Sequence, residues 1–165
     1  MPLPLVTERL RLRPATLDDL DAWHAISRDA ETEWFGKPSS TLDDAKARLE
    51  RHMAHQATHG FSLWAVELRR TGEVIGIAGL GHLWDGTEIE VGYSFLRAHW
   101  GRGYATEAAR AAIAFAFEEL GLDRIVAVTE PQNVASRRVM EKCGLSFVGV
   151  TVHEERTHVK YAITS

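Results

Sequence analysis

Two glycines, Gly101 and Gly103, stand between an alternating apolar segment and a helical one. β-branched and aromatic residues alternate along 88–96, which predicts a strand, and the apolar spacing of 104–120 predicts a helix that stops at Gly121. A glycine-bearing turn that leads into a helix directs several backbone N–H groups to one point, at the positive end of the helix dipole. The sequence therefore predicts a phosphate-binding turn.

Two common nucleotide motifs do not account for this turn. The Walker pattern Gly-x-x-x-x-Gly-Lys-Ser/Thr does not occur in the chain. The dinucleotide pattern Gly-x-Gly-x-x-Gly would need a third glycine where Thr106 stands, and the acidic residue about 20 positions on would fall in a turn at 121–123. Both nucleotide readings are disfavoured.

Three blocks of the chain, in order, resemble a known family, the GCN5-related N-acetyltransferases. Trp-Gly-Arg-Gly-Tyr-Ala at 100–105 is similar to the family's pyrophosphate loop, Gln/Arg-x-x-Gly-x-Gly/Ala, with Trp100 in the first position. Asn-Val-Ala-Ser-Arg-Arg-Val-Met-Glu-Lys-Cys-Gly at 133–144 and Thr-Glu-Arg-Leu-Arg-Leu-Arg-Pro at 7–14 resemble two further blocks. Tryptophan at the first loop position is characteristic of the branch that includes RimJ and RimL.

The resemblance implies that the co-substrate is acetyl-CoA. Backbone N–H groups of five consecutive residues would bind its pyrophosphate: Arg102, Gly103, Tyr104, Ala105 and Thr106. The strand before the loop would splay from its neighbour, and its backbone groups would pair with pantetheine at Phe95, Leu96 and Arg97. The branch often has a proline where this chain has Arg97.

Acetyl transfer from a thioester to an amine needs a deprotonated amine, and the resemblance assigns the base to Glu90 in Glu-Val-Gly-Tyr. A glutamate with the reference pKa of about 4.3 is a weak base for an amine, so the site must raise its pKa or use a water relay. In the alternative interpretation, Glu88 and Glu90 only line the polar face of a strand.

The resemblance makes Ser136 the proton donor to the CoA sulfur. Many relatives use a tyrosine where this chain has Met140, and in the RimJ/RimL-like branch the serine of Asn-x-x-Ser takes its place. Asn133 would contact CoA and also cap the helix that follows it, and helix capping is the alternative role for both polar residues. A backbone N–H near Phe95 would polarise the thioester carbonyl.

Other reactive side chains have less specific patterns. Cys143 has no evident histidine partner and is expected to be a packed thiol. His52, His55 and His59 have a spacing that a metal ion could use, but no acidic or cysteine ligand matches it, so a solvated helix surface and no metal are expected.

Large loop residues can wall an acceptor pocket, and four are candidates here: Trp34, Phe35, His82 and Trp84. Single aromatic residues in loops more often cover the core, which is the alternative for each of them.

The rest of the chain supplies elements that position these groups. Alternating patterns predict strands at 10–13, 62–68, 73–83, 124–129, 145–152 and 156–163, and cap residues or periodicity predict helices from Thr16, from Thr41 toward Gly60, and over 133–142. This order predicts a mixed α/β sheet, mostly antiparallel, with helices on both faces. The strands flanking the helix at 104–120 should be parallel neighbours, and the ligand should enter at the carboxyl end of the first.

Composition sets the outer limits. A chain of 165 residues with 45% hydrophobic residues predicts one domain over residues 1–165. The net charge of −4 disfavours nucleic acid as a partner. No apolar run approaches the length of a membrane span, and no signal peptide is evident. A single cysteine cannot form an internal disulfide, which suits the reducing cytoplasm.

The predicted function is an acetyl-CoA-dependent N-acetyltransferase acting on a protein N-terminal α-amine or a small-molecule amine in a ternary complex. The alternatives are a non-catalytic acyl-CoA-binding sensor or scaffold and an acetyltransferase of charged tRNA. The resemblance also raises the possibility of a homodimer.

Overall fold

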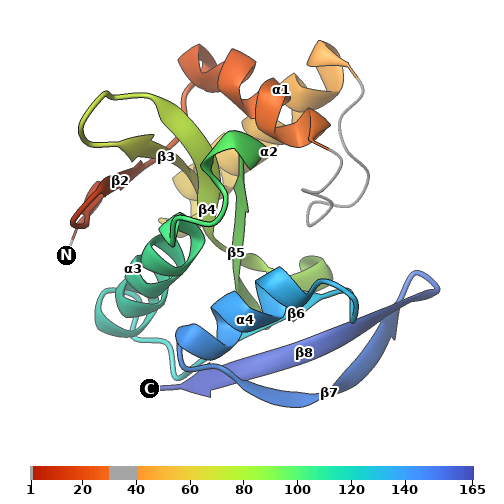
Figure 1. Cartoon of the computed structure of the whole chain (residues 1–165). Coiled ribbons are helices and arrows are strands. Elements are labelled where there is room, and N and C mark those ends of the chain that lie inside the picture. Colours follow the sequence, from red (N-terminus) through yellow and green to blue (C-terminus); the bar gives the residue numbers. More distant parts are fainter. Residues whose placement is uncertain (1, 30–40) are drawn as a thin grey trace.

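The computed structural model describes residues 2–29 and 41–165, and its centre is an eight-stranded sheet (Figure 1). The strands are β1 (Leu5–Val6), β2 (Leu10–Arg13), β3 (Leu63–Leu68), β4 (Val74–His82), β5 (Ile89–Phe95), β6 (Arg124–Thr129), β7 (Ser146–His153) and β8 (Arg156–Thr164). Their order across the sheet is β1-β2-β3-β4-β5-β6-β8-β7. Short β1 is the only strand in the described ranges that the sequence patterns do not predict.

One pair of neighbouring strands, β5 and β6, is parallel, and the other pairs are antiparallel. Helix α3 (Tyr104–Glu118) connects the parallel pair. The predicted mixed sheet with one β-α-β unit is confirmed. Because the turn at Gly101 and Gly103 follows β5, it lies at the carboxyl end of that strand, as expected.

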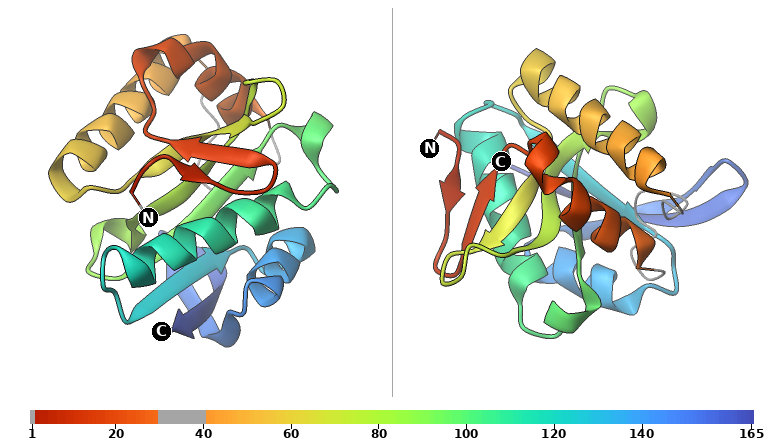
Figure 2. Two further views of the ribbon diagram at one scale, coloured as in Figure 1. Left: turned by 90° about the vertical axis from the view of Figure 1, so that its left-hand side faces the viewer. Right: turned by 90° about the horizontal axis from the view of Figure 1, so that it is seen from above.

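Helices cover both faces of the sheet. Alternation along β3 shows the two sides: Trp64 and Val66 pack into a core with α3, while Leu63 and Ala65 pack into a core with α1 (Leu20–Arg28). Helix α2 (Leu42–His59) lies beside α1, and α4 (Val134–Lys142) lies on the side of α3 (Figures 1 and 2). The expected helices on both faces are therefore present.

Caps explain where the helices begin and end. The Thr41 side chain accepts a hydrogen bond from the Asp44 N–H at 3.1 Å, and α2 ends at Gly60, whose φ of 78° is left-handed. The helix expected from Thr16 instead begins as a 3-10 turn, η1 (Leu17–Asp19), before α1. Two further 3-10 turns are η3 (Leu83–Asp85) and η4 (Arg97–His99). No helix in the described ranges is long and apolar enough to cross a bilayer.

Candidate active site

The glycine turn has the backbone geometry that an anion site needs. Gly101 and Gly103 have φ angles of 75° and 83°, in the left-handed region that glycine adopts readily. Gly103 is the N-cap of α3, and its carbonyl accepts the Glu107 N–H at 3.0 Å. The N–H groups of the first helical turn, at Tyr104, Ala105 and Thr106, precede any carbonyl of their own helix that could accept them. They therefore form a cluster of donors at the positive helix end.

A hydrogen-bond network around Glu107, which the sequence did not predict, supports the glycine turn on the side of the β1–β2 connection. The Glu107 carboxylate accepts hydrogen bonds from the Thr7 hydroxyl at 2.5 Å and from Arg9 Nε at 2.7 Å. Arg9 also donates to the Arg102 carbonyl at 2.9 Å, and its guanidinium lies 4.5 Å from the centre of the Tyr104 ring. The β1–β2 connection thus fixes the loop. Arg102 is not among the residues that line the cavity described below.

Strand β5 separates from β6 beyond one residue pair. The only registered pair between them is Glu90 with Val126, whereas β5 pairs with β4 over its whole length. The Leu96 N–H donates to the Ile75 carbonyl of the β4 side at 3.0 Å. Because successive residues of a strand direct their backbone groups to opposite sides, the Phe95 N–H points toward the opening between β5 and β6.

Two of the three backbone positions expected for pantetheine are engaged elsewhere. Leu96 bonds to β4, and the Arg97 N–H donates to the Asp29 carboxylate at 3.3 Å. Neither residue lines the cavity, whereas Phe95 does. The Phe95 carbonyl accepts the Trp100 indole N–H at 2.7 Å, so this tryptophan ties the end of β5 to the glycine turn. The pantetheine contacts expected for Leu96 and Arg97 stay predictions, since only the backbone N–H groups of these two residues bond elsewhere.

One large cavity, of about 1590 Å³, gathers most of the predicted site residues. It extends from the glycine turn and the start of α4 to the end of β4 and the last turns of α2. The predicted residues that line it are Glu90, Phe95, Gly103, Tyr104, Ala105, Thr106, Asn133, Ser136, His82 and Trp84. Trp34 and Phe35, also predicted, lie outside the described residues.

Glu90 combines burial with the lack of a partner. Its side chain lies on the wall of the cavity, and its Oε2 atom is buried and has no hydrogen-bond partner among the described residues. Burial raises the pKa of Glu90 to about 8, since no opposite charge compensates for lost hydration. Glu88 differs, because Lys160 and Arg124 pair with its carboxylate at 2.5 and 3.1 Å. Of the two glutamates, Glu90 has the properties of a general base.

Ser136 has a partner that the sequence reading missed. The Tyr93 hydroxyl lies 3.0 Å from both the hydroxyl and the carbonyl oxygen of Ser136. Burial raises the pKa of Tyr93 far above its usual value, so the phenol stays protonated. Asn133 caps α4, its side-chain oxygen accepting the Ser136 N–H at 3.1 Å. Both polar side chains of the Asn-x-x-Ser block thus face the cavity from the start of α4.

Tyr93 follows Glu90 by three residues, in the segment Glu-Val-Gly-Tyr, so the missed signal was a second polar group on the same strand. Met140, at the position where many relatives have a tyrosine, is buried in the core. The Tyr93 hydroxyl therefore brings a phenol to Ser136 from β5 rather than from α4.

Cys143 is a packed thiol. Burial raises its pKa to about 11, and its sulfur lies 3.7 Å from the Thr106 carbonyl oxygen. A thiol with this pKa is protonated at neutral pH and is a weak nucleophile.

The histidines of α2 differ from the expected solvated surface. His52 packs against buried Trp23, at 5.8 Å between ring centres, and burial lowers its pKa to about 4. His55 and His59 turn toward His82 at the end of β4, and all three line the cavity. A helix that looks polar in sequence thus forms one wall of the site.

The comparisons with known proteins agree with this geometry. Residues 9–146 match the model of the acetyltransferase (GNAT) domain. The uncharacterized N-acetyltransferase YoaA of Bacillus subtilis is 34% identical over 150 residues, which cover 88% of this chain and 84% of YoaA. An acetyltransferase structure from Agrobacterium tumefaciens is 30% identical with a TM-score of 0.85, covering 98% of this chain and 94% of that one.

A structure of Mycobacterium smegmatis RimJ in complex with CoA-disulfide is 25% identical with a TM-score of 0.77, covering 94% of this chain and 82% of that one. The sheet with its parallel β5–β6 pair and its flanking helices is the fold of these enzymes. The family match extends over most of the chain and includes the glycine turn, Glu90 and Ser136. The chain belongs to the GNAT family and is an acetyl-CoA-dependent N-acetyltransferase.

Proposed function

We propose that this enzyme transfers the acetyl group to a primary amine by direct attack within a ternary complex, with Glu90 as the base. The observation that carries the proposal is the Glu90 carboxyl. Its Oε2 atom is buried and has no hydrogen-bond partner among the described residues, and Glu90 lines the same cavity as the glycine turn. A pKa of about 8 makes a carboxylate basic enough to accept a proton from an ammonium group near neutral pH.

The described residues fit acetyl-CoA at the other end of the cavity. A Cβ atom at Gly101 would meet nothing within 4 Å, so the backbone there is open to a ligand. The N–H groups from Gly103 to Thr106 would bind the pyrophosphate, and Asn133 would contact the same ligand from α4. The opening between β5 and β6 would receive pantetheine, with the Phe95 N–H polarising the thioester carbonyl.

The chemistry then follows from the order of groups along the cavity. Glu90 takes a proton from the acceptor ammonium, and the free amine attacks the thioester carbon. When the tetrahedral intermediate collapses, the carbon–sulfur bond breaks and the thiolate takes a proton from Ser136, whose hydroxyl lies 3.0 Å from that of Tyr93. The second proton lost by the nitrogen restores the Ser136 hydroxyl, and Glu90 releases its proton to water. A thiol of pKa about 8.5 is a good leaving group, so this last proton contributes less than the first.

We propose an α-amine as the acceptor, in the manner of the RimJ/RimL-like branch. An α-amine has a pKa of about 8, close to that of Glu90, whereas lysine at about 10.4 would give up its proton less readily. The Trp-Gly-Arg-Gly-Tyr-Ala block and the similarity to RimJ support this branch. The α-amine belongs to a protein N-terminus or to a small molecule that carries the same group.

The direct experiment is thiol release from acetyl-CoA in the presence of an amine panel. The panel contains peptides with free or blocked N-termini, amino acids and polyamines. We expect turnover with free α-amines and none with the blocked peptides. Tight acetyl-CoA binding in calorimetry without turnover on any amine would favour a sensor or scaffold module, and absence of acetyl-CoA binding would contradict the proposal altogether.

We also propose that two copies pair through β7, which lies at the edge of the sheet. Phe147, Val148, Val150 and Val152 of this strand are each more than half exposed, with Val152 at 66%. An edge strand with an apolar surface favours pairing with another strand. Sedimentation velocity should show a dimer that Val150→Lys weakens. If the unaltered protein is a monomer even at 100 times the concentration used in the thiol-release assay, the proposed dimer is contradicted.

A further inference from the structure

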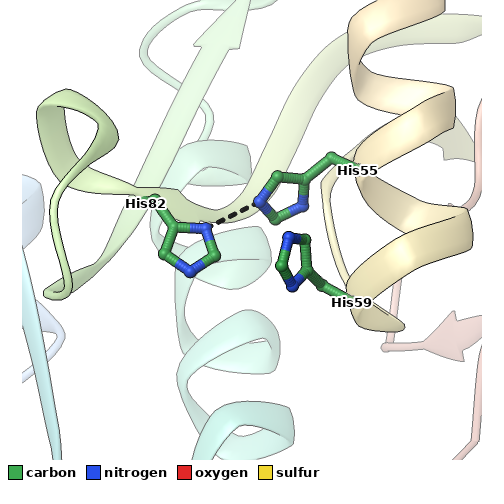
Figure 3. Close-up of side chains that lie close together, drawn as sticks. All are labelled: His55, His59 and His82. Carbon is green, nitrogen blue, oxygen red and sulfur yellow. Dashed lines mark hydrogen bonds between the residues drawn. The ribbon is translucent and has the colours of Figure 1, made fainter.

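Three histidines from distant parts of the chain meet at the end of the cavity that α2 and the end of β4 form, which we call the acceptor end because it lies away from the glycine turn. His55 and His59 are one turn apart on α2, and His82 is the last residue of β4. One ring nitrogen from each lies within 4.8 Å of those of the other two. Figure 3 shows the three imidazole rings turned toward one another across the gap between helix and strand. The histidine triad, defined here as these three residues, joins two walls of the cavity.

The hydrogen bonds of His55 direct one lone pair into the triad. Its Nδ1 lies 2.8 Å from the Phe61 carbonyl oxygen, and a carbonyl only accepts, so Nδ1 carries the proton. In the neutral imidazole, Nε2 then carries the lone pair, and it lies 2.8 Å from Nδ1 of His82. Metal-binding histidines are commonly oriented in this way, with the remote N–H on a backbone carbonyl and the other nitrogen toward the ion.

The distances suit a metal ion after small movements. A tetrahedral Zn²⁺ ion with Zn–N bonds of about 2.0–2.1 Å separates its nitrogen ligands by about 3.3 Å. The His55–His82 nitrogens would move apart slightly from 2.8 Å, with the proton of His82 passing to its outer nitrogen. His59 is exposed and would turn inward.

The surroundings support the ligands as a group. The buried Phe61 ring packs edge-on against His55 at 5.0 Å between ring centres, and the His55–His59 and His59–His82 ring centres are 4.4 and 4.9 Å apart. The i, i+4 spacing on α2 places two ligands on one helix face. The Phe61 ring lies on one side of the triad and the cavity on the other, so a bound ion would be open to the cavity.

We propose that the histidine triad binds a divalent transition-metal ion, with Zn²⁺ as the preferred ion. Three imidazole nitrogens are the ligand set that Zn²⁺ takes when a fourth position is kept for water or a substrate atom. The ion ties the C-terminal end of α2 to the end of β4. This proposal is independent of Glu90 and of the acceptor's identity, because it concerns binding by the protein without acetyl-CoA.

The test is equilibrium dialysis of the tag-free, metal-stripped protein against Zn²⁺, with the bound metal measured by mass spectrometry. We expect one equivalent of zinc at micromolar free Zn²⁺, and a tetrahedral absorption spectrum when Co²⁺ replaces it. His59→Ala should weaken Zn²⁺ binding at least 10-fold, and His82→Ala should do the same. Because His59 is exposed, its variant should retain the fold, which circular dichroism checks.

The matched control is His158→Ala, since His158 lines the same cavity but lies outside the triad. Its Zn²⁺ affinity should equal that of the unaltered protein. Binding that is absent at 100 µM Zn²⁺, or that persists unchanged in both His59→Ala and His82→Ala, would overturn the proposal. A loss in His158→Ala equal to that in His59→Ala would also overturn it, since zinc would then bind elsewhere.

Discussion

The two ends of the cavity are built in different ways. The end proposed to bind acetyl-CoA consists largely of backbone groups at the starts of α3 and α4, held by Gly103 and Asn133. The acceptor end consists of side chains from α2, the end of β4, and the β7–β8 hairpin, with Trp84 stacked on His153 at 4.3 Å. Backbone geometry recurs in short sequence blocks, whereas a side-chain wall is assembled from distant positions. The identity of the cofactor can therefore be predicted from the sequence, whereas the identity of the acceptor cannot.

The largest expected effect lies between the two ends, at Glu90. Glu90→Gln keeps the shape but removes the base, so kcat should fall by about 10²–10⁴-fold. The KM for acetyl-CoA should change little, because the glycine turn is unaltered. Steady-state thiol release measures both constants. An unchanged kcat would remove Glu90 from the mechanism and leave a water-mediated route.

The same residue links the site to stability. Its pKa is about 8 in the folded protein and near 4.5 when unfolded, so folding binds a proton between these values. The stabilisation that the protonated carboxyl contributes is complete below pH 4.5 and is lost as pH rises to 8, on the order of 5 kcal/mol. Urea unfolding should show Glu90→Gln to be the more stable protein at pH 9, with the difference shrinking toward pH 5. An equal stability of the two proteins at pH 9 would contradict the raised pKa.

At the cofactor end, Gly103→Ala should raise the KM for acetyl-CoA about 10-fold, because a Cβ strains the left-handed turn by roughly 1–2 kcal/mol. The new atom would also lie 3.4 Å from Nη2 of Arg9. Gly72→Ala is the matched control, since Gly72 has a similar φ of 76° in the β3–β4 hairpin. If both variants raise KM equally, the effect comes from lost stability and not from the turn.

The smallest effect is expected at the proton donor. Ser136→Ala should lower kcat only a few-fold, because the CoA thiol leaves readily without help. Tyr93→Phe should act through the same proton path, so the double variant should be no slower than the slower single variant. Additive losses in kcat would instead show that the two hydroxyls act separately.

Particular residues show how far the sequence reaches. The alternation of β3, the caps at Thr41 and Gly60 and the glycine turn were predicted, because each depends on neighbours in the chain. The roles expected for Leu96 and Arg97 stay predictions, and the bonds of their N–H groups to Ile75 and Asp29 could not be predicted from the sequence, because both partners lie far away in the chain.

Three further features needed the folded chain. The contact of Tyr93 with Ser136 joins β5 to α4 across 43 residues. The supporting network of Glu107 joins α3 to the β1–β2 connection. The histidine triad joins α2 to β4. The periodic pattern of a helix or strand does not predict such contacts, because it describes each element alone and each contact joins two elements.

The most direct measurement of the central claim is the pH dependence of kcat for the unaltered enzyme and for Glu90→Gln with the same amine. The account predicts that kcat rises with pH through an inflection near 8 in the unaltered enzyme, as Glu90 loses its proton. At saturating amine, Glu90→Gln should lack this inflection, because the variant has no carboxyl group to ionise. The same inflection in both enzymes would contradict the assignment of Glu90 as the base.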